Sequence, residues 1–191
     1  MNYNFEKWKN KSTLSSKNYI CGYCGNDINS NIGYYSDEGI RIFLCHKCGK
    51  PTFIDSLNKQ TPGALFGKTF AVDIPEQINN LYEEAKKCYS VGAYTSVGLC
   101  CRKLLMHICV QLGAQEDLKF IEYVNFLDIE NYIPKNSKKW VDIIRKKGND
   151  VNHEIVILSQ KEAEQLITFS SIIINLVYEN ELLLEQTEVS K

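Results

Sequence analysis

Four cysteines with paired spacing form the strongest chemical pattern in the sequence. Cys21 and Cys24 make one C-x2-C pair, and Cys45 and Cys48 make a second pair after twenty intervening residues. Two residues between thiolates let one tight turn present both sulfur atoms to a tetrahedral ion, and two such turns complete the shell. A closed four-cysteine shell predicts a structural Zn²⁺ site, with two disulfides as the alternative. His46, inside the second pair, is expected to be a bystander, with replacement of one cysteine ligand as the alternative.

A polar segment in the second half of the chain, WVDIIRKKGNDVNHEI, holds the other residues that could do chemistry. If a helix continues through this segment, its polar side chains recur at steps of three or four and share one face. These side chains are Asp142, Arg145, Asn149, Asn152 and His153. Arg102, on an earlier helix, is expected to reach the same face. Such a row of side chains supports three interpretations, which are a structural polar seam between helices, a binding site and a catalytic site.

Residues 135–147 form the most basic segment of the chain, and a single acidic residue, Asp142, interrupts it. Contact with phosphate groups is the functional interpretation of such a run, and an ordinary solvated helix face is the alternative. The candidate nucleic-acid-binding residues are Lys138, Lys139, Lys146 and Lys147.

Composition limits the classes of protein that fit this chain. The formal net charge over 191 residues is −1, so overall charge does not indicate a nucleic-acid-binding protein, although a local patch can. No apolar run reaches the roughly 18 residues of a membrane span. The first twenty residues contain no apolar core region, so the sequence predicts no secretory signal. The four cysteines outside the pairs are expected to be reduced and buried among apolar residues, which agrees with a cytoplasmic location.

The elements that must position these residues fall into two parts. Alternation over residues 32–44 predicts a β-hairpin between the cysteine pairs, turning at residues 37–39. Apolar residues at helical spacing predict helices from residue 75 to about 90, over 94–112 and over 120–128. A further helix is expected to begin near Ser137, and a last one at the capping box SQKE, running to about residue 184. The segment GALFGKT lacks the spacing of a phosphate-binding P-loop.

The fold expected from these elements is mainly α, with a small N-terminal zinc ribbon followed by a helical bundle. Residues 1–55 are expected to hold the ribbon with an N-terminal extension, and residues 56–75 a connector. Residues 76–185 are expected to form the bundle, and residues 186–191 a frayed tail.

Four segments carry a resemblance to a known family. They read LYEEAKKCYSVGAYTSVGLCCRKLLMHICV, FIEYVNFL, WVDIIRKKGNDVNHEI and EAEQLITFSSIIINLVYE. Together with the step CGKPTF after the second cysteine pair, they resemble an uncharacterised bacterial family. Members of that family join a cysteine zinc ribbon to a helical domain of unknown function. That helical domain is similar to the HEPN group (higher eukaryote and prokaryote nucleotide-binding).

The HEPN resemblance implies a homodimer, and in many members a metal-independent ribonuclease with an Arg-x(4–6)-His motif at the dimer cleft. The histidine would assist proton transfer at the ribose hydroxyl, and the arginine would stabilise charge on the phosphate. His153 matches the histidine, and Asn149 matches the polar residue that often follows the arginine. Lys146, Lys147 or Gly148 takes the arginine position, and Arg145 lies just outside the pattern.

Three functions remain open from the sequence. The first is a non-catalytic module that binds nucleic acid, RNA above all, or a partner protein. The second is a ribonuclease that uses His153 with Arg145 or Arg102 in place of the motif arginine. The third is a scaffold without nucleic-acid contact. By analogy with other HEPN-like proteins, the expected setting is phage defence or toxin regulation in a prokaryote.

Overall fold

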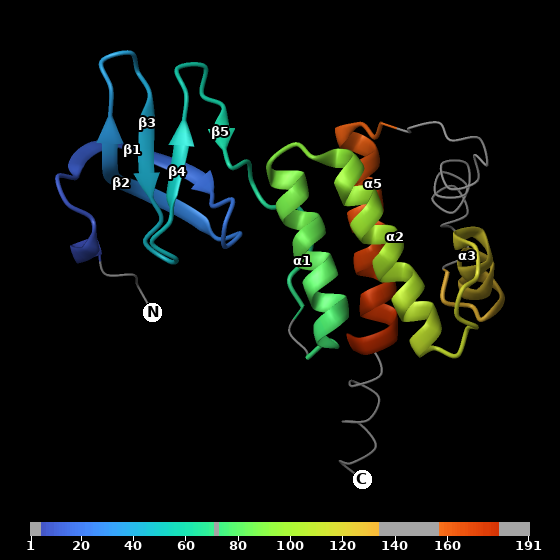
Figure 1. The fold of residues 1–191 in the computed structure, drawn as a ribbon. Coiled ribbons are helices and arrows are strands. Elements are labelled where there is room, and N and C mark those ends of the chain that lie inside the picture. The colour runs from blue at the N-terminus through green and yellow to red at the C-terminus, as the bar shows by residue number, and fades with distance from the viewer. Residues whose placement is uncertain (1–4, 71–72, 134–156, 180–191) are drawn as a thin grey trace, which may run out of the picture. The chain divides into compact units, whose positions relative to one another are not determined.

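The computed structural model describes residues 5–70, 73–133 and 157–179 (Figure 1). The chain divides into two compact units. The first unit comprises Met1–Phe66 with Lys87–Ala93, and the second comprises Gly67–Lys86 with Tyr94–Lys191. The domain boundaries expected at residues 55, 75 and 185 stay predictions.

The first unit is built around a five-stranded antiparallel sheet in the order β1-β2-β3-β4-β5 (Figure 1). A short 3-10 helix, η1 (Phe5–Lys7), precedes it. The strands are β1 (Ser12–Ile20), β2 (Asp27–Tyr35), β3 (Arg41–Leu44), β4 (Pro51–Ile54) and β5 (Gln60–Thr61). Each strand pairs with the next one in the chain, so the sheet is a simple meander.

The hairpin predicted between the cysteine pairs is formed by β2 and β3, which turn through Gly39 at φ 83°. The expectation of a mainly α protein holds only in part, because β1, β4 and β5 enlarge this hairpin to a full sheet. The sequence pattern missed β1 because Tyr19 is its only buried residue. It missed β4 because this strand is four residues long, although Thr52 and Ile54 are buried on either side of exposed Phe53.

The first unit has a hydrophobic core of its own. Apolar side chains from β1 to β4 and from the cysteine turns form this core, which comprises Tyr19, Cys21, Ile28, Phe43, Cys45 and Ile54. Two side-chain hydrogen bonds join the first strand to the β4–β5 hairpin. Gln60 Nε2 donates to the Ile20 carbonyl oxygen at 2.8 Å, and Lys17 Nζ donates to Asn58 Oδ1 at 2.5 Å. The first strand and the last hairpin therefore lie close together.

The helices of the described residues are α1 (Glu76–Ser90), α2 (Tyr94–Gln111), α3 (Phe120–Ile129) and α5 (Gln160–Ile174). A short π-helical turn, η3 (Asn175–Glu179), follows α5. The helices predicted from 75 to about 90, over 94–112 and over 120–128 are confirmed within two residues at both ends. The helix predicted after the capping box begins as expected, but its α-helical part ends at Ile174 and continues as η3, and the end expected near residue 184 lies outside the described residues. The helix expected near residue 137 lies outside the described residues. None of the helices within the described ranges has the length and apolar character needed to cross a membrane.

Helices α2 and α5 supply much of the core of the second unit. Gly98 on α2 permits a close approach, because a Cβ at this position would lie 2.5 Å from Leu158 Cδ1. Cys100, Cys101 and Cys109 are buried along α2, as expected of small apolar side chains. Cys88 departs from that expectation, because it is only partly buried on α1. The predicted capping box begins α5, where the Ser159 side chain accepts a hydrogen bond from the backbone N–H of Glu162.

Candidate metal centre

The two cysteine pairs occupy turns with the same backbone hydrogen bonds. In the first knuckle, residues 21–26, the Cys21 N–H donates to the Asn26 carbonyl at 3.0 Å. In the second knuckle, residues 45–50, the Cys45 N–H donates to the Lys50 carbonyl, also at 3.0 Å. The glycine after each pair closes the turn at 2.8 Å onto the first cysteine, with φ of 68° and 72°. That left-handed backbone is why each knuckle requires a glycine at this position.

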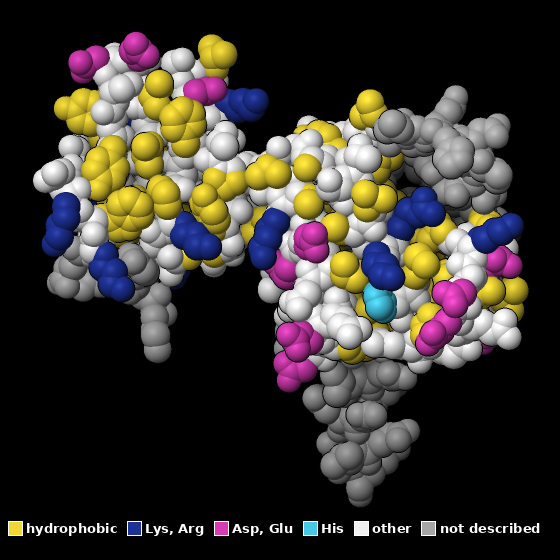
Figure 2. Space-filling model, in the orientation of Figure 1, with side chains coloured by type: hydrophobic (Ala, Val, Ile, Leu, Met, Phe, Trp, Pro, Cys, Tyr) yellow, Lys and Arg dark blue, Asp and Glu magenta, His cyan; other side chains and the backbone are white. Residues whose placement is uncertain are grey.

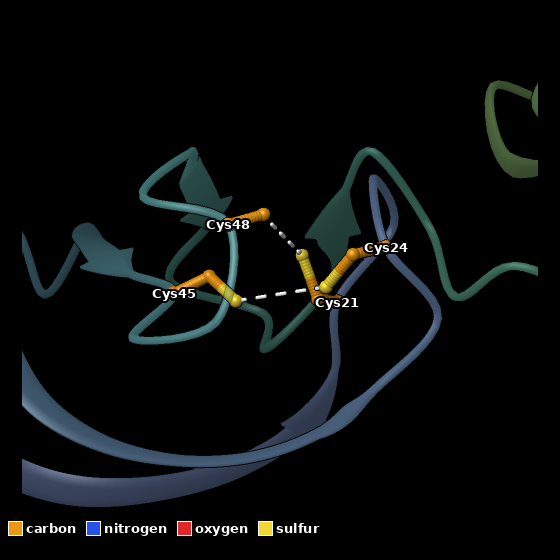
Figure 3. A group of neighbouring side chains, drawn as sticks. All are labelled: Cys21, Cys24, Cys45 and Cys48. Carbon is orange, nitrogen blue, oxygen red and sulfur yellow. Dashed lines mark hydrogen bonds between the residues drawn. The ribbon is translucent and has the colours of Figure 1, made fainter. Parts of the chain in front are cut away.

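The four cysteine sulfur atoms lie within 4.8 Å of one another, so the described residues bring the predicted ligands together (Figure 3). Cys21 Sγ lies 3.8 Å from Cys48 Sγ, and Cys24 Sγ lies 3.7 Å from Cys45 Sγ. A tetrahedral ion with metal–sulfur bonds of ~2.3 Å has sulfur–sulfur edges of about 3.8 Å. Disulfide bonds need sulfur atoms ~2.05 Å apart, and all four cysteines are free. The geometry fits one metal ion bound by four sulfur atoms.

Burial opposes ionisation of two of the four thiols. Burial raises the pKa of Cys21 and of Cys48. For Cys24, burial also raises the pKa, but hydrogen bonds with Asn26, Cys21 and Cys45 together outweigh it and lower the pKa to about 7. Burying thiolates without a positive charge is unfavourable, and a metal ion supplies that charge. The group of candidate ligands comprises the four cysteines, and His46 is not among its members in the described part of the chain.

Several side chains around the knuckles are exposed to solvent. Tyr23 and Lys47 occupy the same position within their knuckles, and both are exposed. Lys50 Nζ lies 4.9 Å from the centroid of the Tyr23 ring, which is a cation–π contact. Trp8 Nε1 donates a hydrogen bond of 3.0 Å to the carbonyl oxygen of Gly49. The N-terminal segment is therefore anchored on the second knuckle.

The proximity of Tyr23, Lys50 and Trp8 to the second knuckle was not predicted from the sequence. The equivalence of Tyr23 and Lys47 could have been found by aligning CGYCGN with CHKCGK. The contact of Trp8 with the second knuckle could not have been found in this way, because Trp8 and Gly49 lie 41 positions apart in the sequence.

The remaining candidate residues are not brought into one site by the described structure. Arg102 is half-buried on α2, where its guanidinium carbon lies 4.5 Å from the centroid of the Phe120 ring. Burial lowers the pKa of Arg102. The other candidate residues lie outside the described residues, so their roles stay predictions: Arg145, Asn149 and His153, with Lys138, Lys139, Lys146 and Lys147.

A model of a protein family, described as Domain of unknown function (DUF4145), matches residues 83–190. No curated protein and no solved structure matches the chain.

Proposed function

The chain belongs to the DUF4145 family of domains of unknown function, and we propose that it is a zinc-assembled, non-catalytic nucleic-acid-binding protein. The sulfur tetrahedron carries this proposal. Four thiolates suit Zn²⁺ among the common divalent ions, because soft sulfur ligands and tetrahedral geometry both favour it. The residues that would hold the ion are Cys21, Cys24, Cys45 and Cys48.

The four-sulfur shell supports a structural role for the ion. A catalytic zinc site keeps one position open for water or substrate, and four cysteine ligands fill all positions of a tetrahedron. The ion would instead join the β1–β2 turn to the β3–β4 turn, because each turn contributes two ligands. The ion would hold the two knuckles at a fixed separation, so that their exposed side chains can act as a binding surface.

Charge around the knuckles supports nucleic acid as the ligand. Residues 7–11 and the two knuckles hold five lysines and no carboxylate. The nearest acidic residues in the sequence are Glu6, directly before this segment, and Asp27, directly after the first knuckle. A lysine-rich surface on a protein of nearly neutral net charge concentrates positive potential in one place, which favours a polyanion.

The proposal extends to the helical domain as a HEPN-like homodimer in a bacterial defence or toxin-regulation system. Its support is the resemblance carried by the four sequence segments. In this arrangement the basic residues 135–147 add a second contact with nucleic acid, and His153 and Asn149 contribute to binding or to helix packing. A metal-independent ribonuclease centred on His153 is the competing function.

One experiment tests the proposal against both alternatives. The zinc-loaded full chain is titrated into a fluorescent RNA of mixed sequence at several salt concentrations, and the RNA is then analysed for cleavage. We expect binding whose log K falls linearly with log salt, and intact RNA. Cleavage that persists with a metal chelator and is lost in His153→Ala would overturn the non-catalytic assignment. The absence of salt-dependent binding would overturn nucleic-acid binding and leave a scaffold.

A further inference from the structure

We infer that the metal knuckles form a stacking platform for single-stranded nucleic acid, with Tyr23 as the aromatic surface and Lys47 and Lys50 as its phosphate contacts. This inference rests on the proposed function and assigns it to one surface. Tyr23 is 43% exposed, so part of its ring is open to solvent. Bases stack on such rings whatever their sequence, because every base has a π-face.

Both knuckles are closed by the same hydrogen bonds, and their four sulfur atoms lie within 4.8 Å of one another, so a metal ion bound there would hold the platform rigid. Tyr23 projects from the middle of the first knuckle, and Lys47 from the equivalent position of the second. Lys50 is also exposed and lies over the Tyr23 ring at 4.9 Å. A base stacked on the face of Tyr23 away from Lys50 would therefore have the Lys50 ammonium group beside the ring, with Lys47 exposed on the second knuckle for an adjoining phosphate.

The N-terminal segment beside the second knuckle adds further lysines to the surface around Tyr23. In the space-filling view, hydrophobic side chains gather over the sheet of the N-terminal unit, with lysine and arginine side chains along its margins (Figure 2). Trp8 is anchored to Gly49 and lies 6.2 Å, centroid to centroid, from the Tyr34 ring. The segment that carries Trp8 also carries Lys7, Lys9 and Lys11. A single strand that leaves Tyr23 can therefore continue along a basic segment.

A single strand fits this surface better than a duplex. In a duplex the bases are stacked on one another, so an aromatic ring reaches them only where the strand is unpaired. The five exposed lysines lie on two separate segments, residues 7–11 and the second knuckle. This arrangement suits a flexible single-stranded backbone that can adjust to each of them. The inference therefore predicts preference for unpaired RNA or DNA, with little dependence on base sequence.

The test compares single-residue variants of the zinc-loaded full chain in binding to a single-stranded oligonucleotide. We expect Tyr23→Ala to raise Kd about tenfold, because the stacking surface is lost. Tyr23→Phe is expected to stay within about twofold of wild type, because the ring remains. Lys50→Gln is expected to lower the slope of log K against log salt by about 0.7, the value for one phosphate contact on a single strand.

Two matched control variants show whether the effect is specific to the knuckles. Tyr35 is 63% exposed at the far end of β2, and Lys59 is exposed beside β5. Tyr35→Ala and Lys59→Gln are expected to bind like wild type, and a duplex of the same sequence is expected to bind more weakly than the single strand.

The variants separate this inference from the proposed function. If wild type binds RNA with salt dependence but Tyr23→Ala binds equally well, the platform is wrong and the proposed function stands. Equal affinity for duplex and single strand would also overturn the platform. If wild type shows no salt-dependent binding at all, both fail together.

Discussion

Gly22, in the first knuckle, lies directly against the carbonyl oxygen of Gly63. A Cβ built on Gly22 would stand 2.3 Å from that oxygen and 2.8 Å from Pro62 Cγ. The backbone of Gly63 is itself fixed, because its N–H donates to the Ser90 carbonyl oxygen at 2.7 Å. The chain after β5 thus covers one side of the metal-binding turn, and only a residue without a side chain fits between them.

Gly22→Ala is therefore expected to destabilise the first unit by about 2 kcal/mol, because backbone atoms must move to admit the methyl group. Gly39→Ala provides the comparison. Gly39 has open space around it but a φ of 83°, so that substitution is expected to cost about 1 kcal/mol from backbone strain alone. Chemical denaturation of both variants measures the difference. A smaller loss for Gly22→Ala than for Gly39→Ala would contradict the contact with Gly63.

Removing one metal ligand is expected to unfold the N-terminal sheet. Cys48→Ser replaces a thiolate by a weak ligand, and the small core cannot remain folded without the free energy of metal binding. The bound metal, measured as zinc per chain, is expected to fall from one equivalent to almost none, with loss of β-sheet signal in circular dichroism. Cys88→Ser is the control, because Cys88 lies on α1 and outside the cysteine cluster. Full zinc content in Cys48→Ser would refute the four-cysteine centre.

Tyr82 makes the second unit sensitive to alkaline pH. Burial raises the pKa of its phenol from the usual 10 to about 12. Above pH 10 the unfolded chain releases this proton while the folded chain retains it, so the stability that Tyr82 contributes falls as pH rises from 10 towards 12. Tyr82→Phe is expected to flatten this fall. The measurement is the free energy of unfolding of both proteins at pH 8, 10 and 11, and parallel profiles would contradict the burial of the phenol.

The same substitution is expected to cost about 1–2 kcal/mol at neutral pH. The Tyr82 hydroxyl accepts a hydrogen bond of 3.0 Å from the Lys68 N–H. Phenylalanine would leave that partly buried N–H without its acceptor.

Ser159 is expected to stabilise the start of α5 by about 1 kcal/mol. Its side chain accepts from the Glu162 N–H at 3.4 Å, and its own N–H donates to Glu162 Oε2 at 2.8 Å. Ser159→Ala removes the first of these bonds and is expected to lower the denaturation midpoint. Lys161→Ala, at an exposed position of the same turn, is expected to change stability by less than about 0.5 kcal/mol. Equal stability of the two variants would show that the cap contributes nothing.

Features that depend on neighbouring residues were predictable from the sequence. The spacing of Cys21 with Cys24 and of Cys45 with Cys48 predicted the cluster of four sulfur atoms, because a C-x2-C turn fixes both thiolates locally. Helices α2 and α3 and the capping box of α5 were also predicted, since helix hydrogen bonds and caps join residues three or four positions apart. The roles predicted for residues 134–156 remain predictions.

Features that join distant parts of the chain were decided by the tertiary structure. The sequence of β1, STLSSKNYI, shows little alternation of apolar and polar residues. This segment is a strand because it pairs with β2. Trp8 reaches Gly49 across 41 residues, and Gln60 reaches Ile20 across 40. Each of these contacts depends on where folding brings two separate segments, and no local pattern encodes that position. By itself the sequence determined the cluster of four cysteines, helices α2 and α3 and the start of α5. The tertiary structure decided the sheet and the surface around the knuckles, because hydrogen bonds between strands and contacts between loops form only when the whole unit folds.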